Sequence, residues 1–251
     1  MPGNKKRIVI IGATSSIAEH CARLWGEEAA CSLVLVGRDL EKTNRIAADL
    51  RVRNSASEIE TLEANFIDPL TIRRTVDDIV ARQAIDIVLI AHGSLPDQET
   101  CQQDLSVAHD ALLLNGISPV LFAEAFAGHM QKAGHGSLAI IGSVAGDRGR
   151  KSNYVYGAAK GLVARYIQGL QHRLAATNVK VIIVKPGPTD TPMTAHLKQK
   201  GVRLARVEEV AGLINAAINQ GNPVVYAPAK WRSIMMIIIH LPSFVFNHMN
   251  I

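Results

Sequence analysis

The chain has 251 residues, which is enough for one large domain or two small ones. Apolar residues make up 48% of the chain and charged residues only 20%, which excludes a disordered or collagen-like protein. The 27 Lys and Arg residues exceed the 22 Asp and Glu residues, for a net charge of +5. This mild excess suits anionic ligands, and we expect no nucleic-acid partner.

Cysteine and histidine spacing indicates neither a disulfide framework nor a metal site. Cys21, Cys31 and Cys101 form no CxxC pair, and the nine histidines show no spacing typical of metal ligands. Reduced thiols favour a cytoplasmic protein. The first apolar run, Ile8–Ile11, is far shorter than the core of a signal peptide, so we expect no export.

Short β-branched runs alternate with longer segments of helical period, a pattern typical of βαβ units in a parallel sheet. Buried strands are predicted at Arg7–Ile11, Ser32–Gly37, Ile85–Ala91, Ser137–Gly142 and Val179–Lys185, and weaker ones at Glu58–Glu63 and Pro223–Ala227. The pattern predicts a single doubly wound α/β domain with about seven strands over residues 1–229, followed by an apolar tail at 230–251. Ligands of such domains bind at the carboxyl ends of the strands.

A turn of small residues follows the first strand and leads into a helix that is predicted from Ile17 to about Glu28. Such a turn lets backbone N–H groups and the helix N-terminus face a pyrophosphate. The residues that would contact it are Gly12, Thr14, Ser15, Ser16 and Ile17. Ser16 and Ala18 occupy positions where glycines would allow the closest approach, so an ordinary strand-to-helix turn is the alternative.

The second strand ends in Gly37-Arg38-Asp39, where a dinucleotide fold reads the ribose 2′ position. Arg38 offers a guanidinium to a 2′-phosphate, whereas an acidic residue there would favour NAD. The sequence therefore predicts NADP(H) in preference to NAD(H). The alternative is a solvated Arg38 beside an Asp39 that caps the next helix.

Tyr156 and Lys160 lie four residues apart in a helical stretch, so both project from one face. A lysine near a phenol favours the tyrosinate and can bring proton exchange toward neutral pH. Ser143 stands at the end of the predicted fifth strand, and Asn115 lies in a helix that Gly116 and Pro119 weaken.

These four residues, in this order, resemble the tetrad of the short-chain dehydrogenase/reductase family, and the resemblance runs from Arg7 to Ala227. It implies a Rossmann-type fold, an NAD(P)-dependent enzyme acting on a CH-OH group, and a homodimer or homotetramer. It also implies that Tyr156 donates or accepts the proton and that Ser143 binds the carbonyl oxygen. Lys160 would hold the nicotinamide ribose, and Asn115 would keep its helix open around a water. Tyr156 and Lys160 also count as cofactor contacts. The others that the resemblance implies are Asn65, Phe66, Ala91, His92, Gly93, Pro186, Gly187, Thr189 and Thr191.

The segment from Pro192 to about Val207 corresponds to the family's mobile lid and carries Lys198, Lys200, Arg203 and Arg206. A basic lid suits a phosphate or carboxylate on the substrate, with a solvated positive face as the alternative. The tail from Lys230 to Phe246 is apolar nearly all round. It predicts contact with a membrane surface or burial in a subunit interface.

The lid, the tail and the segment Ile90–Gln98 are similar to a subgroup of reductases that act on polyprenyl-phosphate-linked keto-sugars. This similarity implies a lipid-linked carbonyl substrate and a cytoplasmic enzyme that is peripheral on the inner face of the membrane. A 3-oxoacyl thioester or another small ketone is the alternative substrate. A catalytically silent nucleotide sensor or interaction protein is the alternative of another class.

Overall fold

The computed structural model describes residues 5–199 and 201–249. A seven-stranded sheet in the order β3-β2-β1-β4-β5-β6-β7 forms the centre of the molecule, and every neighbouring pair is parallel. The strands are β1 (Arg7–Ile11), β2 (Ser32–Gly37), β3 (Glu58–Glu63), β4 (Ile87–Ile90), β5 (Gly136–Ile141), β6 (Val179–Pro186) and β7 (Val224–Ala227). The predicted doubly wound α/β fold is confirmed, and the predicted strands match with shifts of at most two residues at their ends.

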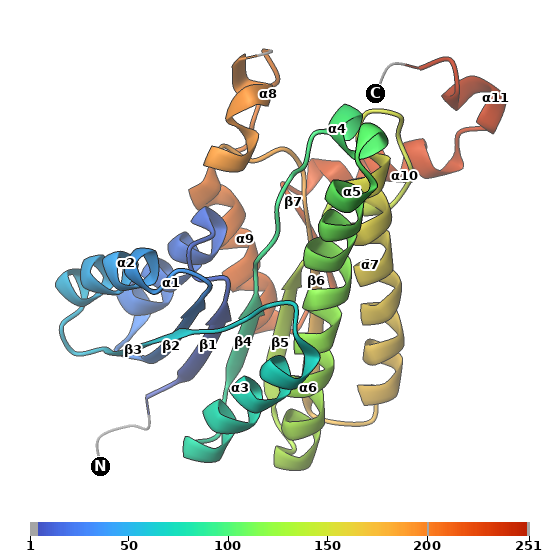
Figure 1. Ribbon diagram of the computed structural model, residues 1–251. Helices are drawn as coiled ribbons and strands as arrows, with labels where there is room; N and C mark the ends of the chain where they lie inside the picture. The colour runs from blue at the N-terminus through green and yellow to red at the C-terminus, as the bar shows by residue number, and fades with distance from the viewer. Residues whose placement is uncertain (1–4, 200, 250–251) are drawn as a thin grey trace.

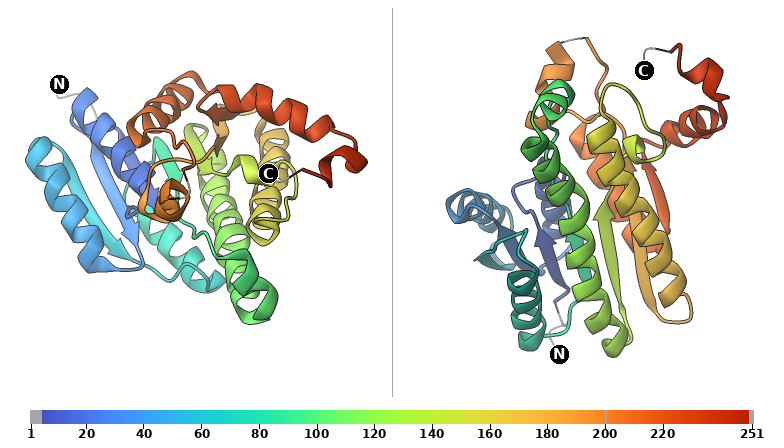
Figure 2. Two further views of the ribbon diagram at one scale, coloured as in Figure 1. Left: turned by 90° about the horizontal axis from the view of Figure 1, so that it is seen from above. Right: turned by 45° about the vertical axis from the view of Figure 1, so that its right-hand side comes forward.

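Helices cover both faces of the sheet, which is why each central strand is a continuous apolar run (Figures 1 and 2). One face carries α3 (Pro69–Arg82), α6 (Ser118–Ala133) and α7 (Tyr154–Leu174). The other face carries α1 (Ser16–Glu28), α2 (Leu40–Arg53) and α9 (Val207–Gln220). Alternate strand residues therefore enter two separate cores.

The shorter helices lie at the carboxyl edge of the sheet or beyond it (Figure 1). They are α4 (Gln98–Gln103), α5 (Leu105–Leu112), α8 (Ala195–Gln199), α10 (Lys230–His240) and α11 (Ser243–Phe246). Helix α5 continues through a π-helical turn at Leu113–Ile117 into α6. The whole stretch Leu105–Ala133 is long and apolar enough to cross a membrane by length and composition, but most of its apolar part is buried in the molecule. We interpret it as a core helix.

Candidate active site

The turn after β1 has the shape that a phosphate-binding turn needs. Gly12 has φ +86°, and a Cβ there would lie 2.6 Å from the backbone nitrogen of His92, so only glycine fits. Helix α1 then begins at Ser16, one residue before the predicted start. Its first residues, Ser16 and Ile17, line the cavity beside Thr14 and Ser15, so the N–H groups that a helix leaves unpaired at its start lie at the cavity.

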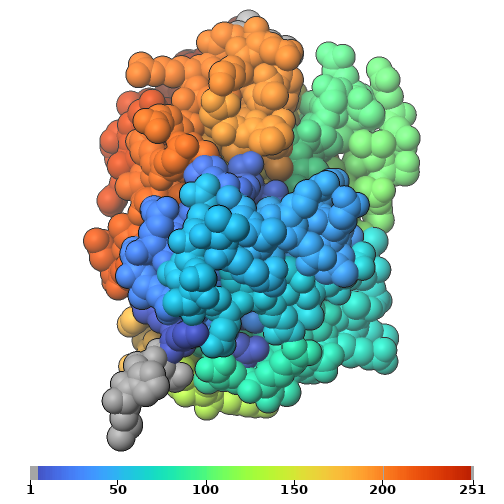
Figure 3. Space-filling view, turned by 90° about the vertical axis from the view of Figure 1, so that its left-hand side faces the viewer, coloured from blue at the N-terminus to red at the C-terminus, as the bar shows by residue number. Residues whose placement is uncertain are grey.

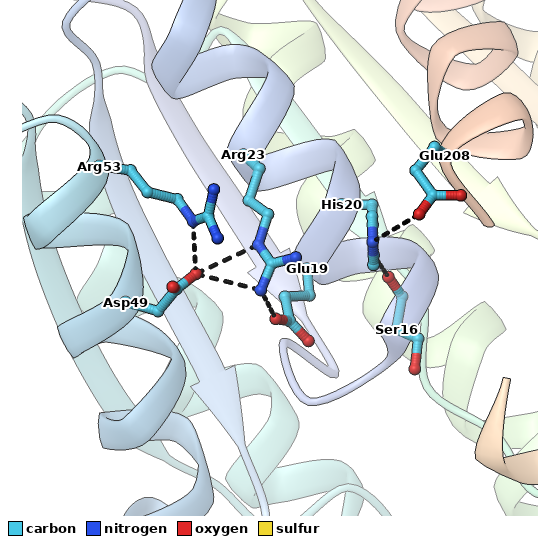
Figure 4. A network of polar contacts seen from close by, with 7 residues as sticks. All are labelled: Ser16, Glu19, His20, Arg23, Asp49, Arg53 and Glu208. Carbon is cyan, nitrogen blue, oxygen red and sulfur yellow. Dashed lines mark hydrogen bonds and ion pairs between the residues drawn. The ribbon is translucent and has the colours of Figure 1, made fainter.

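Polar contacts fix α1 against its neighbours (Figure 4). Asp49 of α2 accepts a hydrogen bond of 3.1 Å from Nε of Arg23 on α1 and another of 2.8 Å from Arg53. Nδ1 of His20 contacts the carbonyl oxygen of Ser16 at 2.8 Å, while its Nε2 lies 3.7 Å from Glu208 of α9. These contacts hold the amino end of α1 at the cavity.

Gly37 ends β2 and is followed by Arg38 and Asp39, and the three residues have different contacts. Arg38 is exposed, lines the cavity and makes no ion pair within the described part of the chain. Asp39 caps α2 by accepting the N–H of Lys42, as in the alternative reading of this position, and this hydrogen bond lowers the pKa of its carboxyl. The space beside Gly37 is occupied by Thr43, so Gly37 serves packing and offers no room to a ligand.

Of the two implied cofactor contacts that follow β3, only one lies at the cavity. Phe66 lines the cavity, whereas Asn65 is exposed and lies outside the cavity lining. The Asn65 side chain accepts the N–H groups of Ile67 and Asp68 at 2.9 and 3.3 Å. Its oxygen therefore serves the local turn, because an Asx turn uses the acceptor that a ligand would need.

His92 lies buried at the back of the cavity, next to Ala91 and Gly93, which also line it. Its ring packs edge-on against Phe66 at 4.7 Å and Phe122 at 5.7 Å, and its Nε2 lies 2.8 Å from the Ser118 hydroxyl. Burial lowers its pKa to about 3, so the ring is neutral at physiological pH. Nδ1 has no hydrogen-bond partner among the described residues.

Asn115 sits in the π-helical turn between α5 and α6, as expected for a residue that keeps its helix open. Its Nδ2 donates to the carbonyl oxygen of Ala111 at 2.9 Å, and its Oδ1 accepts the N–H of Ser94 at 2.7 Å. The side chain thereby joins the helix to the segment that follows β4. Asn115 is fully buried and lines the cavity.

Ser143, Tyr156 and Lys160 converge on the cavity from β5 and α7. Burial raises the pKa of Tyr156 to about 12, and a hydrogen bond with Ser143 partly offsets this rise. Lys160 is buried, donates to the carbonyl oxygen of Ile141 at 3.0 Å and has a pKa lowered to about 8 by burial. Its Nζ lies 5.8 Å from the centre of the Tyr156 ring. Burial therefore outweighs the expected effect of Lys160 on the pKa of the phenol.

The cavity wall includes Pro186, the last residue of β6, and Gly187, Thr189 and Thr191 of the loop that follows. The indole ring of Trp231 packs on Gly187 so closely that a Cβ there would overlap it. Helix α10 of the tail thus rests directly on a loop whose residues are implied cofactor contacts.

Two features near the site escaped the sequence analysis. Oε1 of Gln98 accepts the N–H of Val155 at 3.0 Å and so caps the amino end of α7, the helix of Tyr156. Asp147, just beyond Ser143, pairs with Lys185 at 2.5 Å and accepts a hydrogen bond of 2.8 Å from the Tyr226 hydroxyl. For Gln98, the only local signal was the Pro-Asp-Gln sequence at the start of α4. Asp147 had no local signal, because its contacts reach residues of β6 and β7 that are distant in the sequence.

All these parts surround one cavity of about 340 Å³ at the carboxyl ends of the strands. In the space-filling view, the α8 segment and the α4–α5 segment stand on either side of a notch above the α1–α2 edge (Figure 3). Every residue predicted to act in catalysis or to contact the cofactor, except Asn65, lines this cavity. Within residues 5–199 and 201–249, no group of three His, Cys, Asp or Glu residues could hold a metal ion.

The lid is less positive than its sequence suggests. Lys198 pairs with Asp190 at 2.6 Å, and Arg206 lies 3.5 Å from Glu208. Lys200 lies outside the described residues, and Arg203 is exposed. Two of the predicted substrate-binding cations therefore already have acidic neighbours.

Comparison with known proteins agrees with this geometry. The short chain dehydrogenase family matches residues 6–201. An uncharacterized oxidoreductase of Mycobacterium tuberculosis is 30% identical over 243 residues, covering 96% of each chain. An uncharacterized oxidoreductase of Streptomyces coelicolor is 27% identical over 251 residues, covering 98% of this chain and 97% of the relative.

Solved structures of similar fold include a short-chain dehydrogenase from Sphingobium yanoikuyae in complex with NADPH, with a TM-score of 0.79, 24% identity, and coverage of 95% of this chain and 97% of that one. A short chain dehydrogenase from Burkholderia cenocepacia in complex with NADP has a TM-score of 0.79, 18% identity and coverage of 96% and 100%. The family match and the 30% identical relative together show that the chain belongs to the short-chain dehydrogenase family and is an NAD(P)-dependent oxidoreductase acting on CH-OH groups.

Proposed function

We propose that this protein reduces a ketone to a secondary alcohol with NADPH, in preference to NADH. The observation that carries the proposal is the convergence of Asn115, Ser143, Tyr156 and Lys160 on one cavity that also contains the Gly12 turn and Arg38. A nucleotide-sensing protein would need the turn but has no use for the complete tetrad.

The cavity residues fit a dinucleotide. The turn at Gly12 leads into the start of α1 at Ser16, where the N–H groups that the helix leaves unpaired would bind a pyrophosphate. Arg38, with no acidic partner among the described residues, would hold a 2′-phosphate. When bound, NADPH supplies the hydride.

The protein's own residues supply orientation and the proton. A raised pKa of about 12 keeps Tyr156 protonated at neutral pH, so its hydroxyl can donate a proton to the oxygen of a carbonyl. Ser143, hydrogen-bonded to Tyr156, would hold that same oxygen. Lys160 would hold the ribose hydroxyls, and Asn115, fixed by Ala111 and Ser94, would support a water that links Lys160 to solvent.

For the substrate, we propose a carbonyl on a lipid-phosphate-linked sugar, in a cytoplasmic enzyme attached to the inner face of the membrane. The sequence of residues 90–98, the lid and the apolar tail support this choice. The ion pairs of Lys198 and Arg206 weaken the argument from the lid, which leaves a 3-oxoacyl thioester as the second candidate.

We also propose a homodimer or homotetramer that packs through the helices containing Asn115 and Tyr156. Apolar side chains on these helices support this packing, because Leu105, Leu112, Leu162 and Tyr166 are exposed.

The test is the affinity of the purified protein for NADPH and NADH, measured by fluorescence titration. We expect tighter binding of NADPH. In Arg38→Leu, the NADPH dissociation constant should rise by roughly ten- to a hundredfold, because a charge-assisted hydrogen bond contributes about 1.5–3 kcal/mol, while NADH binding should stay within about threefold.

Arg45→Leu is the matched control. Arg45 is also an exposed arginine, but it lies on α2 outside the cavity lining and pairs with Glu41. Equal losses in the two variants would contradict the role of Arg38. Failure of the wild type to bind either nucleotide would favour a catalytically silent protein.

A further inference from the structure

The carboxyl-terminal tail, formed by α10 and α11, presents large apolar side chains to solvent. Met236 is 60% exposed, Ile237 62% and Phe244 74%, whereas Met235 points inward and is fully buried. Ile239 and Val245 are exposed as well. In Figure 2 the tail runs along one side of the molecule and extends beyond α7. Apolar residues that crowd the outward side of a helix are atypical of a surface in contact only with water.

Internal contacts fix the shape of the tail without any partner. The Arg148 guanidinium donates to the carbonyl oxygens of Ile238 and Leu241 at 2.5 and 2.7 Å, which satisfies the end of α10. The same group lies 3.8 Å from the centre of the Phe246 ring. Nη2 of Arg150 contacts the sulfur of Met235 at 3.3 Å. These contacts hold α10 and α11 in the position that leaves the other apolar side chains outward.

The Lys, Arg, Asp and Glu residues of the tail all carry one sign of charge. Residues 228–249 contain no Asp or Glu, but they include Lys230 and Arg232, both of which are exposed. A groove of about 360 Å³ lies between the tail and the loop at 149–151, lined by Arg150, Lys151, Tyr154 and Phe246 among others. Nε of Arg150 is buried and has no hydrogen-bond partner among the described residues. Arg150 and Lys151 give this groove a positive charge that suits an anionic group.

We infer that the tail docks on an anionic lipid bilayer, with α10 lying in the headgroup layer. Apolar side chains flanked by cations fit such a layer, because the former enter the acyl boundary and the latter meet lipid phosphates. A second copy of the chain fits less well. A two-fold interface through this surface would bring each copy's acid-free tail, with Lys230 and Arg232, against the same charges of the other.

This inference rests on the membrane location in the proposed function and names the segment that would bind the membrane, but it does not depend on the reductase chemistry. It follows that α10 would link the bilayer to the cavity, because its Trp231 rests on Gly187 of the cavity wall. The carbonyl would then be reduced close to the lipid surface.

The experiment is flotation of the full-length protein with vesicles of phosphatidylcholine alone or of an equimolar mixture with phosphatidylglycerol. We expect the wild type to float with the anionic vesicles, more weakly as salt is added, and not with the neutral ones. The double variant Met236→Glu/Ile237→Glu should bind at least about tenfold more weakly, because two apolar side chains are lost and two negative charges are added.

Val52→Glu is the matched control, since Val52 is 87% exposed on α2, away from the tail, and it should float like the wild type. Light scattering on the same proteins tests whether a second copy of the chain covers the tail instead of a bilayer. If the double variant converts a wild-type dimer to a monomer while the wild type fails to float, a second copy covers the tail and the inference is wrong.

Equal flotation of the double variant and the wild type would also overturn the inference. NADPH binding is measured on all these proteins without vesicles. A loss of flotation with unchanged NADPH binding separates failure of membrane docking from failure of the proposed reaction.

Discussion

Burial moves the pKa values of Tyr156 and Lys160 in opposite directions, because it disfavours the charged form of each group. The pKa of the Tyr156 phenol rises to about 12, and the pKa of the Lys160 ammonium falls to about 8. At neutral pH the pair is therefore a protonated phenol beside a mostly charged lysine. This state suits donation of a proton to a substrate oxygen.

The pH dependence of ketone reduction should follow the protonation state of Lys160. Below about pH 8 its ammonium is charged and can hold the ribose; as the pH rises through about 8 it loses the proton. We expect kcat/KM for ketone reduction to be level on the acid side of this value and to fall above it. Lys160→Arg keeps the charge at all these pH values and should lack the alkaline fall, whatever its overall rate. A wild-type profile that is level to pH 10 would contradict the assignment.

Replacement of Tyr156 by Phe removes the proton donor and preserves the ring. We expect kcat to fall by roughly 10²- to 10⁴-fold, the range for loss of general acid catalysis. NADPH affinity should change little, because the ring still fills its place in the cavity wall. Single-turnover kinetics with any accepted ketone would measure the effect. A variant with wild-type turnover would assign the proton to another group.

At the scale of elements, the contact of Asp147 with Lys185 joins the turn after β5 to β6. The side chains are 5% and 10% exposed, and Tyr226 of β7 donates to the same carboxylate. Burial and this hydrogen bond raise the pKa of the Tyr226 hydroxyl. The three residues connect the segment of Ser143 to the strand that leads into the loop at Gly187.

Asp147→Asn should therefore destabilise the protein strongly, because it leaves the Lys185 charge buried without a counter-charge. Loss of one partner of a buried pair costs about 3–5 kcal/mol, and we expect a loss of this order in urea unfolding. Asp190→Asn is the control, since it breaks the exposed pair with Lys198 and should cost at most about 1 kcal/mol. Similar losses in the two variants would show that the Asp147 pair behaves as a surface pair.

The elements themselves were largely predictable, because a strand buried on both faces must be a continuous apolar run. The strands β1, β2 and β3 were predicted with their bounds unchanged. The cavity lining could be predicted because parallel strands end at one edge. The contacts of the Asn65 side chain could not be predicted, because the choice between a local turn and a ligand depends on the fold of the next three residues. Contacts such as Asp147 with Lys185 join residues far apart in sequence, where spacing carries no signal.

For the molecule as a whole, His92 predicts sensitivity to acid. The unfolded chain binds a proton to this ring near pH 6.5, but the folded protein binds it only near pH 3. Between these values the unfolded state holds more protons, so the free energy of unfolding falls as the pH falls. The contribution approaches about 1.4 kcal/mol per pH unit below 6.5.

The check is urea unfolding between pH 7 and 4. His92→Asn, which keeps a polar group near Ser118 and removes the titration, should lose less stability over this range than the wild type. Parallel losses in both proteins would attribute the acid sensitivity to other groups.

The strand order has a consequence for how the chain is made. β1 lies between β2 and β4, and its Ile8 pairs with Ile87 on one side and Leu33 on the other. During synthesis, β1–β3 can pair before β4 has left the ribosome, but this half-sheet then has the apolar edge of β1 open to solvent. Open edges of this kind recruit other chains. Nascent chains stalled between β3 and β4 should therefore be the form most dependent on chaperones, and completion of β4 should end that dependence.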